Sequence, residues 1–292
     1  MANSSTAITS LQAVKRYLRL TTSDDDRLLS ELIDVATDKI EHFCQRSFVT
    51  TNHKQFIDGS GTGTLSIPNY PVTRITRIGW DRENAISVTA TTASDLRATV
   101  EVQDNQIVLK RWDSTGTETE TSRAFATYKT TATMATQITA TTGFSATADA
   151  TVLCDELMRQ GGQDALANSA QLYYMKATDA DYRVDEETGE ISLLSAQSET
   201  QWYPFDPNAL VFPRGNKNIF VDYTAGYEQF TGIPQALQEV AWQLVANAYH
   251  SGKHDPAVAS ESLDGYSYST RGAIELRDDH MRIMYPYRRN AE

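Results

Sequence analysis

The sequence predicts an α+β protein: a mainly α-helical core with a small antiparallel β element, plus an inserted α+β or β-rich subdomain. Apolar residues recur at helical spacing in 24–44 and 234–251, and residues 48–80 alternate polar and apolar with a period of two. The stretch from about 82 to 200 follows neither pattern. We therefore divide the chain into the first part of the core (1–81), the inserted subdomain (82–216), the second part of the core (217–277) and a C-terminal tail (278–292).

Two helices are predicted before residue 45. The first covers 9–20, behind Thr9 or Ser10 as a cap. The second covers 24–44, behind Thr22 or Ser23, with three aspartates (24–26) in its first turn, where the helix dipole favours anions. This explanation is sufficient for the aspartates, so we do not assign them a catalytic role. The apolar stripe of the second helix comprises Leu28, Leu29, Leu32, Ile33, Ala36, Ile40 and Phe43.

Residues 48–80 are predicted to form antiparallel strands joined by tight turns. Three glycines lie between the first two strands, at positions 59, 61 and 63. A phosphate-binding loop needs a helix after it and a different glycine spacing, and here a β-like sequence follows. We interpret the glycines as a hairpin turn that uses positive φ.

The inserted stretch holds ten threonines between residues 127 and 151. Helices are predicted near 132–142 and 151–160, and a hairpin at DEETGE, 185–190. Asp179 and Asp181 have the spacing of the first two ligands of a calcium-binding loop. Arg183, however, occupies the position of the third ligand, and Val184 occupies the position of the glycine that such a loop needs for its turn. We interpret this segment as a solvated loop.

After the insert, the sequence predicts a strand over 218–227 that ends at Gly226, and a helix over 234–251 that begins at Pro234. His250 and His254 lie four residues apart beside Asp255, but Gly252 interrupts the helix, so we predict a surface pair rather than a metal site. A polar-aromatic segment (262–269) and a helix over 273–284, ended by Pro286, complete the chain.

The composition narrows the function classes. The formal net charge of −12 argues against a surface that grips duplex DNA. The sequence has no apolar run long enough for a membrane span and no secretory signal pattern, which predicts synthesis in the cytosol. The two cysteines, Cys44 and Cys154, are predicted to be buried thiols. We predict no cofactor, no metal and no catalytic residue.

The order of segments is similar to that of the head-tail connector (adaptor) proteins of tailed bacteriophages. The ordered set comprises YLRLTTSDDD, IEHFCQRSFV, FIDGSGTGTLSIPNYPVTRI, VDYTAGY, IPQALQEVAWQLVANAY, LDGYSYS and YPYRR. Its strongest parts are YPVT after an apolar strand and AGY before P-x-x-L-x-x-A. The resemblance covers 8–80 and 217–289, while typical members have a much shorter connection in place of 82–216.

The resemblance implies a virion structural protein of the neck, made in the host cytoplasm, that forms a ring, commonly of twelve subunits, under the portal protein. Such a ring completes the head, extends the DNA channel without binding DNA specifically, and docks the tail or the next neck protein. It has no membrane partner and no enzymatic activity. The resemblance also implies that the C-terminal segment reaches the portal, which points to Met281, Met284, Tyr285, Tyr287, Arg288 and Arg289.

Three alternatives stay open at this stage. The chain could be another neck or tail protein, such as a completion or terminator protein. It could be a carbohydrate-active enzyme that uses paired carboxylates of the acidic insert. The insert could also bind carbohydrate or the host surface, which is compatible with the connector prediction. For the basic-aromatic tail, we favour protein docking over nucleic-acid binding.

Overall fold

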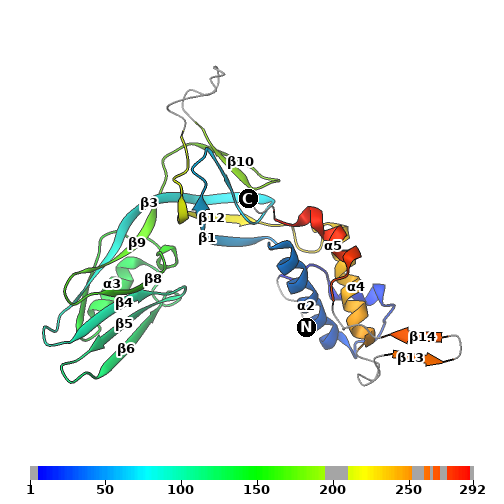
Figure 1. Cartoon of the computed structure of the whole chain (residues 1–292), viewed down its shortest axis with the longest axis horizontal. Helices are drawn as coiled ribbons and strands as arrows, with labels where there is room; N and C mark the ends of the chain where they lie inside the picture. The colour runs from blue at the N-terminus through cyan, green and yellow to red at the C-terminus, as the bar shows by residue number, and fades with distance from the viewer. Residues whose placement is uncertain (1–5, 195–209, 252–259, 264–265, 270–274, 290–292) are drawn as a thin grey trace, which may run out of the picture.

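The computed structural model describes residues 6–194, 210–251, 260–263, 266–269 and 275–289. Three parts form an arch in Figure 1: a β-rich lobe on the left, a central sheet across the top and a group of helices on the right. Each part has its own cluster of buried apolar side chains. The chain therefore consists of three parts, each with a hydrophobic core of its own.

Four α-helices form the helical part: α1 (Leu11–Tyr17), α2 (Asp26–Cys44), α4 (Gln235–Ser251) and α5 (Asp278–Met284). Ser10 caps α1, because its hydroxyl accepts a hydrogen bond from the amide of Ala13 at 3.2 Å. The two long helices pack against each other through the stripes predicted from the sequence, except that Leu28 is 46% exposed and lies outside the packed face. The residues buried there include Leu29, Ile33, Ile40, Leu237, Val240 and Leu244.

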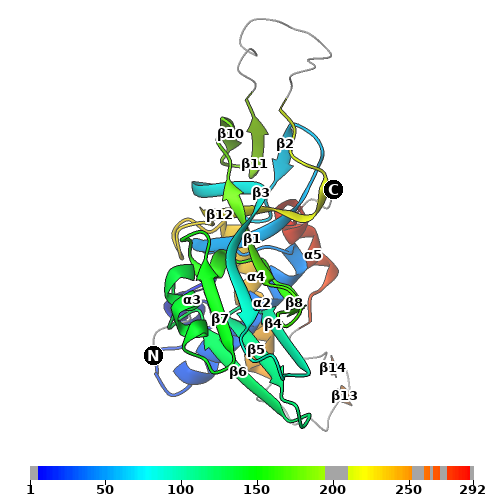
Figure 2. The ribbon, with the colours of Figure 1, turned by 90° about the vertical axis from the view of Figure 1, so that its left-hand side faces the viewer.

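The central antiparallel sheet follows the order β1 (Thr51–Gly59), β12 (Gly215–Ala225), β3 (Val72–Ala90) and β7 (Phe144–Ala148), with β9 (Ala170–Ala177) also paired to β3. The 19-residue β3 pairs with β12 in its first half and with β9 and β7 in its second half. In Figure 2 this strand descends from the central sheet into the lobe. A single continuous strand therefore links the two parts and crosses residues 81 and 82.

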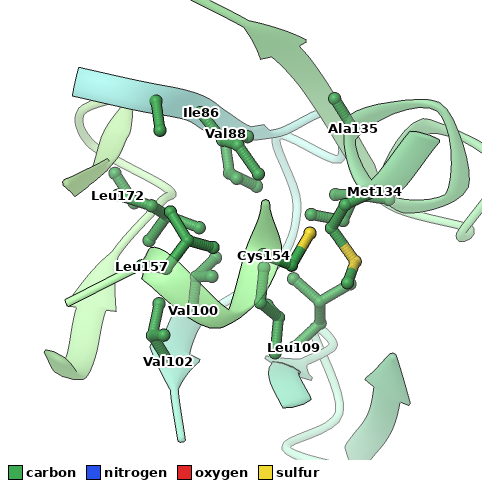
Figure 3. Packing of buried hydrophobic residues seen from close by; sticks show 14 of the residues in the cluster. Ile86, Val88, Val100, Val102, Leu109, Met134, Ala135, Cys154, Leu157 and Leu172 are labelled. Atoms are coloured by element: carbon green, nitrogen blue, oxygen red, sulfur yellow. The ribbon is translucent and has the colours of Figure 1, made fainter. Parts of the chain in front are cut away.

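The lobe contains a second sheet in the order β6 (Glu118–Ala124), β5 (Gln106–Trp112), β4 (Arg97–Val102) and β8 (Gln160–Asp164). Helix α3 (Thr131–Thr139) and the 3₁₀ turn η1 (Cys154–Glu156) complete it. Figure 3 shows Cys154 between Leu109 and Met134 in the lobe core. Both cysteines are free and buried, as predicted.

A smaller sheet of β10 (Tyr182–Asp185), β11 (Glu190–Leu193) and β2 (Thr64–Ser66) lies against the central sheet. The DEETGE segment forms the β10–β11 turn, with Gly189 at φ 72°. A separate hairpin, β13 (Ser260–Leu263) and β14 (Tyr266–Ser269), follows α4 in the chain.

The prediction of a mainly α-helical fold is wrong. Strands account for 38% of the described residues and helices for 26%, in a mixed α+β architecture. The β element is not small, because the insert supplies all four strands of the second sheet and extends the central one with β7 and β9. Strict apolar alternation does not mark these strands in the sequence, because β5 has a continuous apolar run and β6 and β8 are almost entirely polar.

Three local predictions also need correction. The GSGTG segment turns the chain between β1 and β2, but these strands do not pair with each other, so it is not a hairpin. The helix predicted over 151–160 is only the short turn η1. The last helix begins at Asp278, and residues 270–274 lie outside the described residues.

Candidate interaction surfaces

The segment predicted to dock to a partner lies along the C-terminal end of α2. It consists of α5 and the 3₁₀ turn η2 (Tyr285–Tyr287). The amide of Arg289 donates a hydrogen bond to the carbonyl oxygen of Cys44 at 2.9 Å, and the Arg288 guanidinium lies 5.8 Å from the centre of the Phe43 ring. Arg288 and Arg289 therefore pack onto the helical core.

The six residues predicted to dock differ in exposure. Tyr285 is 69% exposed, and Arg288 and Arg289 are also exposed. Met281 and Tyr287 are half-buried. Met284 is fully buried in the helical core, where the Cys44 thiol points at its carbonyl oxygen from 3.9 Å. A partner that docks to this structure can reach Tyr285 and the arginines, but not Met284.

A groove of about 1250 Å³ lies along β1, at the edge of the central sheet, and Leu65 and Ser66 of β2 form part of its lining. The edge strand β1 contributes Gln55 to Gly59, the end of α2 contributes Glu41, Gln45 and Arg46, and the lobe contributes Asp104, Met158 and Arg159. Lys217 and Arg289 also line it. Figure 1 shows β1 as the lowest strand of the sheet, facing the space between the lobe and the helices.

Arg46 is the most buried basic residue of this groove, with 5% of its surface exposed. Its guanidinium stacks on the Tyr70 ring, 3.4 Å from the ring centre, and lies 5.0 Å from that of Phe48. It donates a hydrogen bond to the Tyr70 carbonyl oxygen, while its Nε has no partner in the described structure. Arg46 forms no ion pair with any described residue.

A chain of hydrogen bonds behind the groove connects α2 to the central sheet. The amide of Ser47 donates to Asn69 Oδ1 at 2.8 Å, Asn69 Nδ2 donates to the Tyr223 hydroxyl at 3.1 Å, and this hydroxyl donates to Gln55 Oε1 at 3.1 Å. His53 stacks on the Tyr223 ring, and burial lowers the pKa of this histidine.

Glu41 lies at the helix end of the groove. Its carboxylate accepts a hydrogen bond from the amide of Phe48 at 3.0 Å. Burial raises the pKa of this carboxyl group, and the hydrogen bond from Phe48 partly opposes that shift. Glu41 therefore helps to hold the chain between α2 and β1.

The remaining sequence candidates are spread over the molecule. Among the glycines of the GSGTG segment, only Gly61 has a positive φ, 74°. Asp179 and Asp181 are exposed. His250 lies exposed in the last turn of α4, while His254 and Asp255 fall outside the described residues. Within the described part of the chain, no group of three His, Cys, Asp or Glu side chains could hold a metal ion, and no helix is long and apolar enough to cross a membrane.

Sequence reasoning did not find the groove. Its basic residues come from separate places, Arg46 after α2 and Lys217 in β12. They meet because β1 pairs with β12 in a register that joins Ile57 to Ile219. No local sequence signal could have predicted this pairing, because alternation shows which face of a strand is buried but not which strand is its partner.

Residues 8–122 match the sequence pattern of the phage gp6-like head-tail connector protein family. Over this segment, which is less than half of its length, the chain is similar to phage head-tail connector proteins. The matched segment contains α1, α2, β1 to β5 and most of β6, so it continues past residue 81 into the lobe. The family resemblance predicted for 8–80 is confirmed, and the match does not reach 217–289. This family is one of structural connectors of the particle neck and not of enzymes.

Two solved structures were matched over the whole length of the chain. The neck of an empty gene transfer agent particle, computed with C6 symmetry, has 14% identity and a TM-score of 0.43. The neck of a native gene transfer agent particle, computed with C12 symmetry, has 13% identity and a TM-score of 0.42. Each comparison covers 100% of this chain and 94% of the other. These values do not establish a shared fold. No curated protein matches the chain.

Proposed function

We propose that this connector forms a ring, of twelve subunits, beneath the portal protein, completes the head, and docks the tail or the next neck protein. The observation that carries the proposal is the family match over residues 8–122. Twelve copies at −12 each give a ring of about −144 formal charges. An acidic channel wall would repel phosphates, so DNA would slide through without specific binding.

We assign portal docking to the C-terminal segment, 278–292. Tyr285 and Arg288 are both exposed, and an aromatic ring and a guanidinium are the residue types that dominate protein interfaces. Arg289 adds a second guanidinium. Met284 is packed in the helical core and so holds the segment that carries these groups in place. In this proposal 82–216 is an added projection on the particle.

Negative-stain imaging of the protein with and without isolated portal rings tests this function. A ring that forms on the portal supports the proposal. A ring that binds only to tail tubes would contradict it and would favour a tail completion or terminator protein.

Substitution of the exposed groups tests the docking segment. Tyr285→Ala with Arg288→Glu should weaken portal binding at least tenfold. Truncation after Asp278 is a less specific test, because it also removes Met284 from the core and so changes stability as well as the docking surface. Tyr17→Ala with Arg16→Glu is the matched control, since these residues are exposed on α1 and carry the same chemistry. The assignment is wrong if the Tyr285 and Arg288 variant binds the portal as tightly as the unmodified protein.

A further inference from the structure

One stripe of α2 is only partly covered by the helical core. It comprises Leu28, Leu32, Val35, Lys39 and His42, and we call it the outer face of α2. Leu28 and Val35 are 46% and 42% exposed, while Leu32 lies at the margin of the core. The five residues are spaced alternately by four and three positions, which is the spacing of one side of a coiled coil. The outer face therefore has the pattern that receives a second helix.

A groove of about 970 Å³ lies along the C-terminal half of this face. Val35, His42 and Phe43 of α2 line it, and Leu276, which lies just before α5, lines it as well. From Leu28 to His42 the outer face is about 21 Å long, or about four turns of helix. An apolar stripe of this length and spacing matches a helix that packs alongside α2.

The charges around the outer face are mainly negative. Three exposed carboxylates form no ion pair within the described part of the chain, those of Asp34, Asp38 and Glu275. Glu41 also lines the groove, and Lys39 is the single lysine or arginine among its described lining residues. Glu31, on the same side of α2, pairs with Arg27 and adds no net charge. This surplus of carboxylates favours a partner with basic side chains.

The described helices of this chain do not themselves offer such a partner. α1 is basic but has only seven residues, and α5 has seven and begins with two aspartates. α3 and α4 contain no lysine or arginine. Two α2 helices placed side by side would bring their carboxylates together, which is unfavourable. The charges therefore favour a helix of another protein.

We propose that the outer face of α2 binds a basic amphipathic helix of another protein, with Leu28 and Val35 against its apolar residues and Asp38 and Glu275 facing its lysines or arginines. This surface goes beyond the portal contact assigned to residues 278–292, because no residue of the outer face lies in that segment. The two proposals can therefore fail separately.

A synthetic helix tests the binding. The probe is a fluorescein-labelled peptide of about three heptads, with leucine at positions a and d, lysine at e and g, and alanine elsewhere. Its lysines repel one another, which opposes pairing of the peptide with itself. We expect saturable binding to the full chain, measured by fluorescence anisotropy. A peptide of the same composition in scrambled order keeps the charge but has no apolar face, so it should bind about tenfold more weakly.

Substitutions in the chain test the location. Val35→Lys places a positive charge in the outer face and should weaken binding of the lysine peptide about tenfold. Leu153→Lys is the matched control, because Leu153 is also 42% exposed but lies in the lobe, and this variant should bind as the unmodified protein does. Asp38→Asn should weaken binding about threefold. Asp181→Asn, at an exposed carboxylate next to β10, should leave it unchanged.

Three results would overturn the proposal. These are no saturable binding of the lysine peptide up to millimolar concentration, equal binding of the scrambled peptide, or equal weakening by Val35→Lys and Leu153→Lys. Analytical ultracentrifugation adds a fourth: self-association that Val35→Lys abolishes would assign the outer face to a second copy of this chain instead.

Discussion

Arg77 of β3 forms an ion pair with Glu156 of η1, and both side chains are largely buried, with 16% and 10% of their surfaces exposed. Arg77 also donates a hydrogen bond to the carbonyl oxygen of Met175 in β9. Nearby, Lys54 of β1 pairs with Asp155 at 2.8 Å. These contacts join the central sheet to the lobe, in addition to the strand β3 that runs through both.

Glu156→Gln should destabilise the chain by about 3 kcal/mol, because it leaves the Arg77 charge buried without its partner. The midpoint of urea unfolding measures the change. A double variant, Arg77→Met with Glu156→Met, should recover part of the loss, since neither charge then remains. Equal stability of Glu156→Gln and the unmodified chain would show that the pair does not hold the lobe.

Met284→Ala should cost about 3 kcal/mol of stability, because it opens a cavity in the fully buried core of the helical part. Tyr285→Ala, one residue away, should change stability by no more than about 0.5 kcal/mol, since Tyr285 is 69% exposed. Thermal unfolding of the two variants compares them directly. Similar losses in both would mean that Met284 is not packed as described.

Gly226 ends β12 at φ 122°, and a Cβ added there would lie 2.6 Å from backbone atoms of Val49 and Thr50. Gly226→Ala should therefore cost more than about 2 kcal/mol. Gly116→Ala isolates the backbone strain, because Gly116 has φ 84° but no atom within 4 Å of an added Cβ. It should cost about 1 kcal/mol. Urea midpoints of both variants give the difference, and equal losses would contradict the steric explanation.

Stability should fall as the pH is lowered through 6.5. Burial lowers the pKa of His280, which lies fully buried with Nε2 3.0 Å from Gln243 Oε1, and burial also lowers the pKa of His53. Below 6.5 the unfolded chain takes up protons that the folded chain does not, so acidification favours unfolding until the lowered pKa values are reached. NMR titration of the histidine ring protons measures both pKa values.

His280→Gln removes one of these groups and provides the control. The free energy of unfolding of this variant should depend less on pH just below 6.5 than that of the unmodified chain. An unchanged pH dependence, or a His280 midpoint at or above 6.5, would show that His280 is not buried in its neutral form.

The thiols of Cys44 and Cys154 should not react with Ellman's reagent in the folded chain. Burial raises the pKa of Cys44 to about 11 and that of Cys154 to about 12, so almost no thiolate exists at neutral pH. In denaturant, two thiols per chain should react. Rapid reaction of either thiol under native conditions would mean that its core opens readily.

Much of the helical part could be predicted from the sequence. The helices predicted over 24–44 and 234–251 correspond to α2 and α4 of the structure. They could be predicted because an apolar period of 3.6 residues identifies a helix and shows which of its faces is buried. The burial of the cysteines was also correct. The docking segment was located by resemblance, but its sequence did not show that Met284 lies inside the core while Tyr285 lies outside it.

The sequence by itself determined the two long helices, the β character of 48–80 and the resemblance of residues 8–80 to head-tail connectors. Only the tertiary structure decided that β is the larger part of the fold, that β3 continues across residues 81 and 82, and that β1 pairs with β12 at one edge of the central sheet. The physical reason is the range of the interactions. A helix makes its hydrogen bonds within four residues, so its pattern is complete locally, whereas a strand depends on a partner that here lies more than 150 residues away.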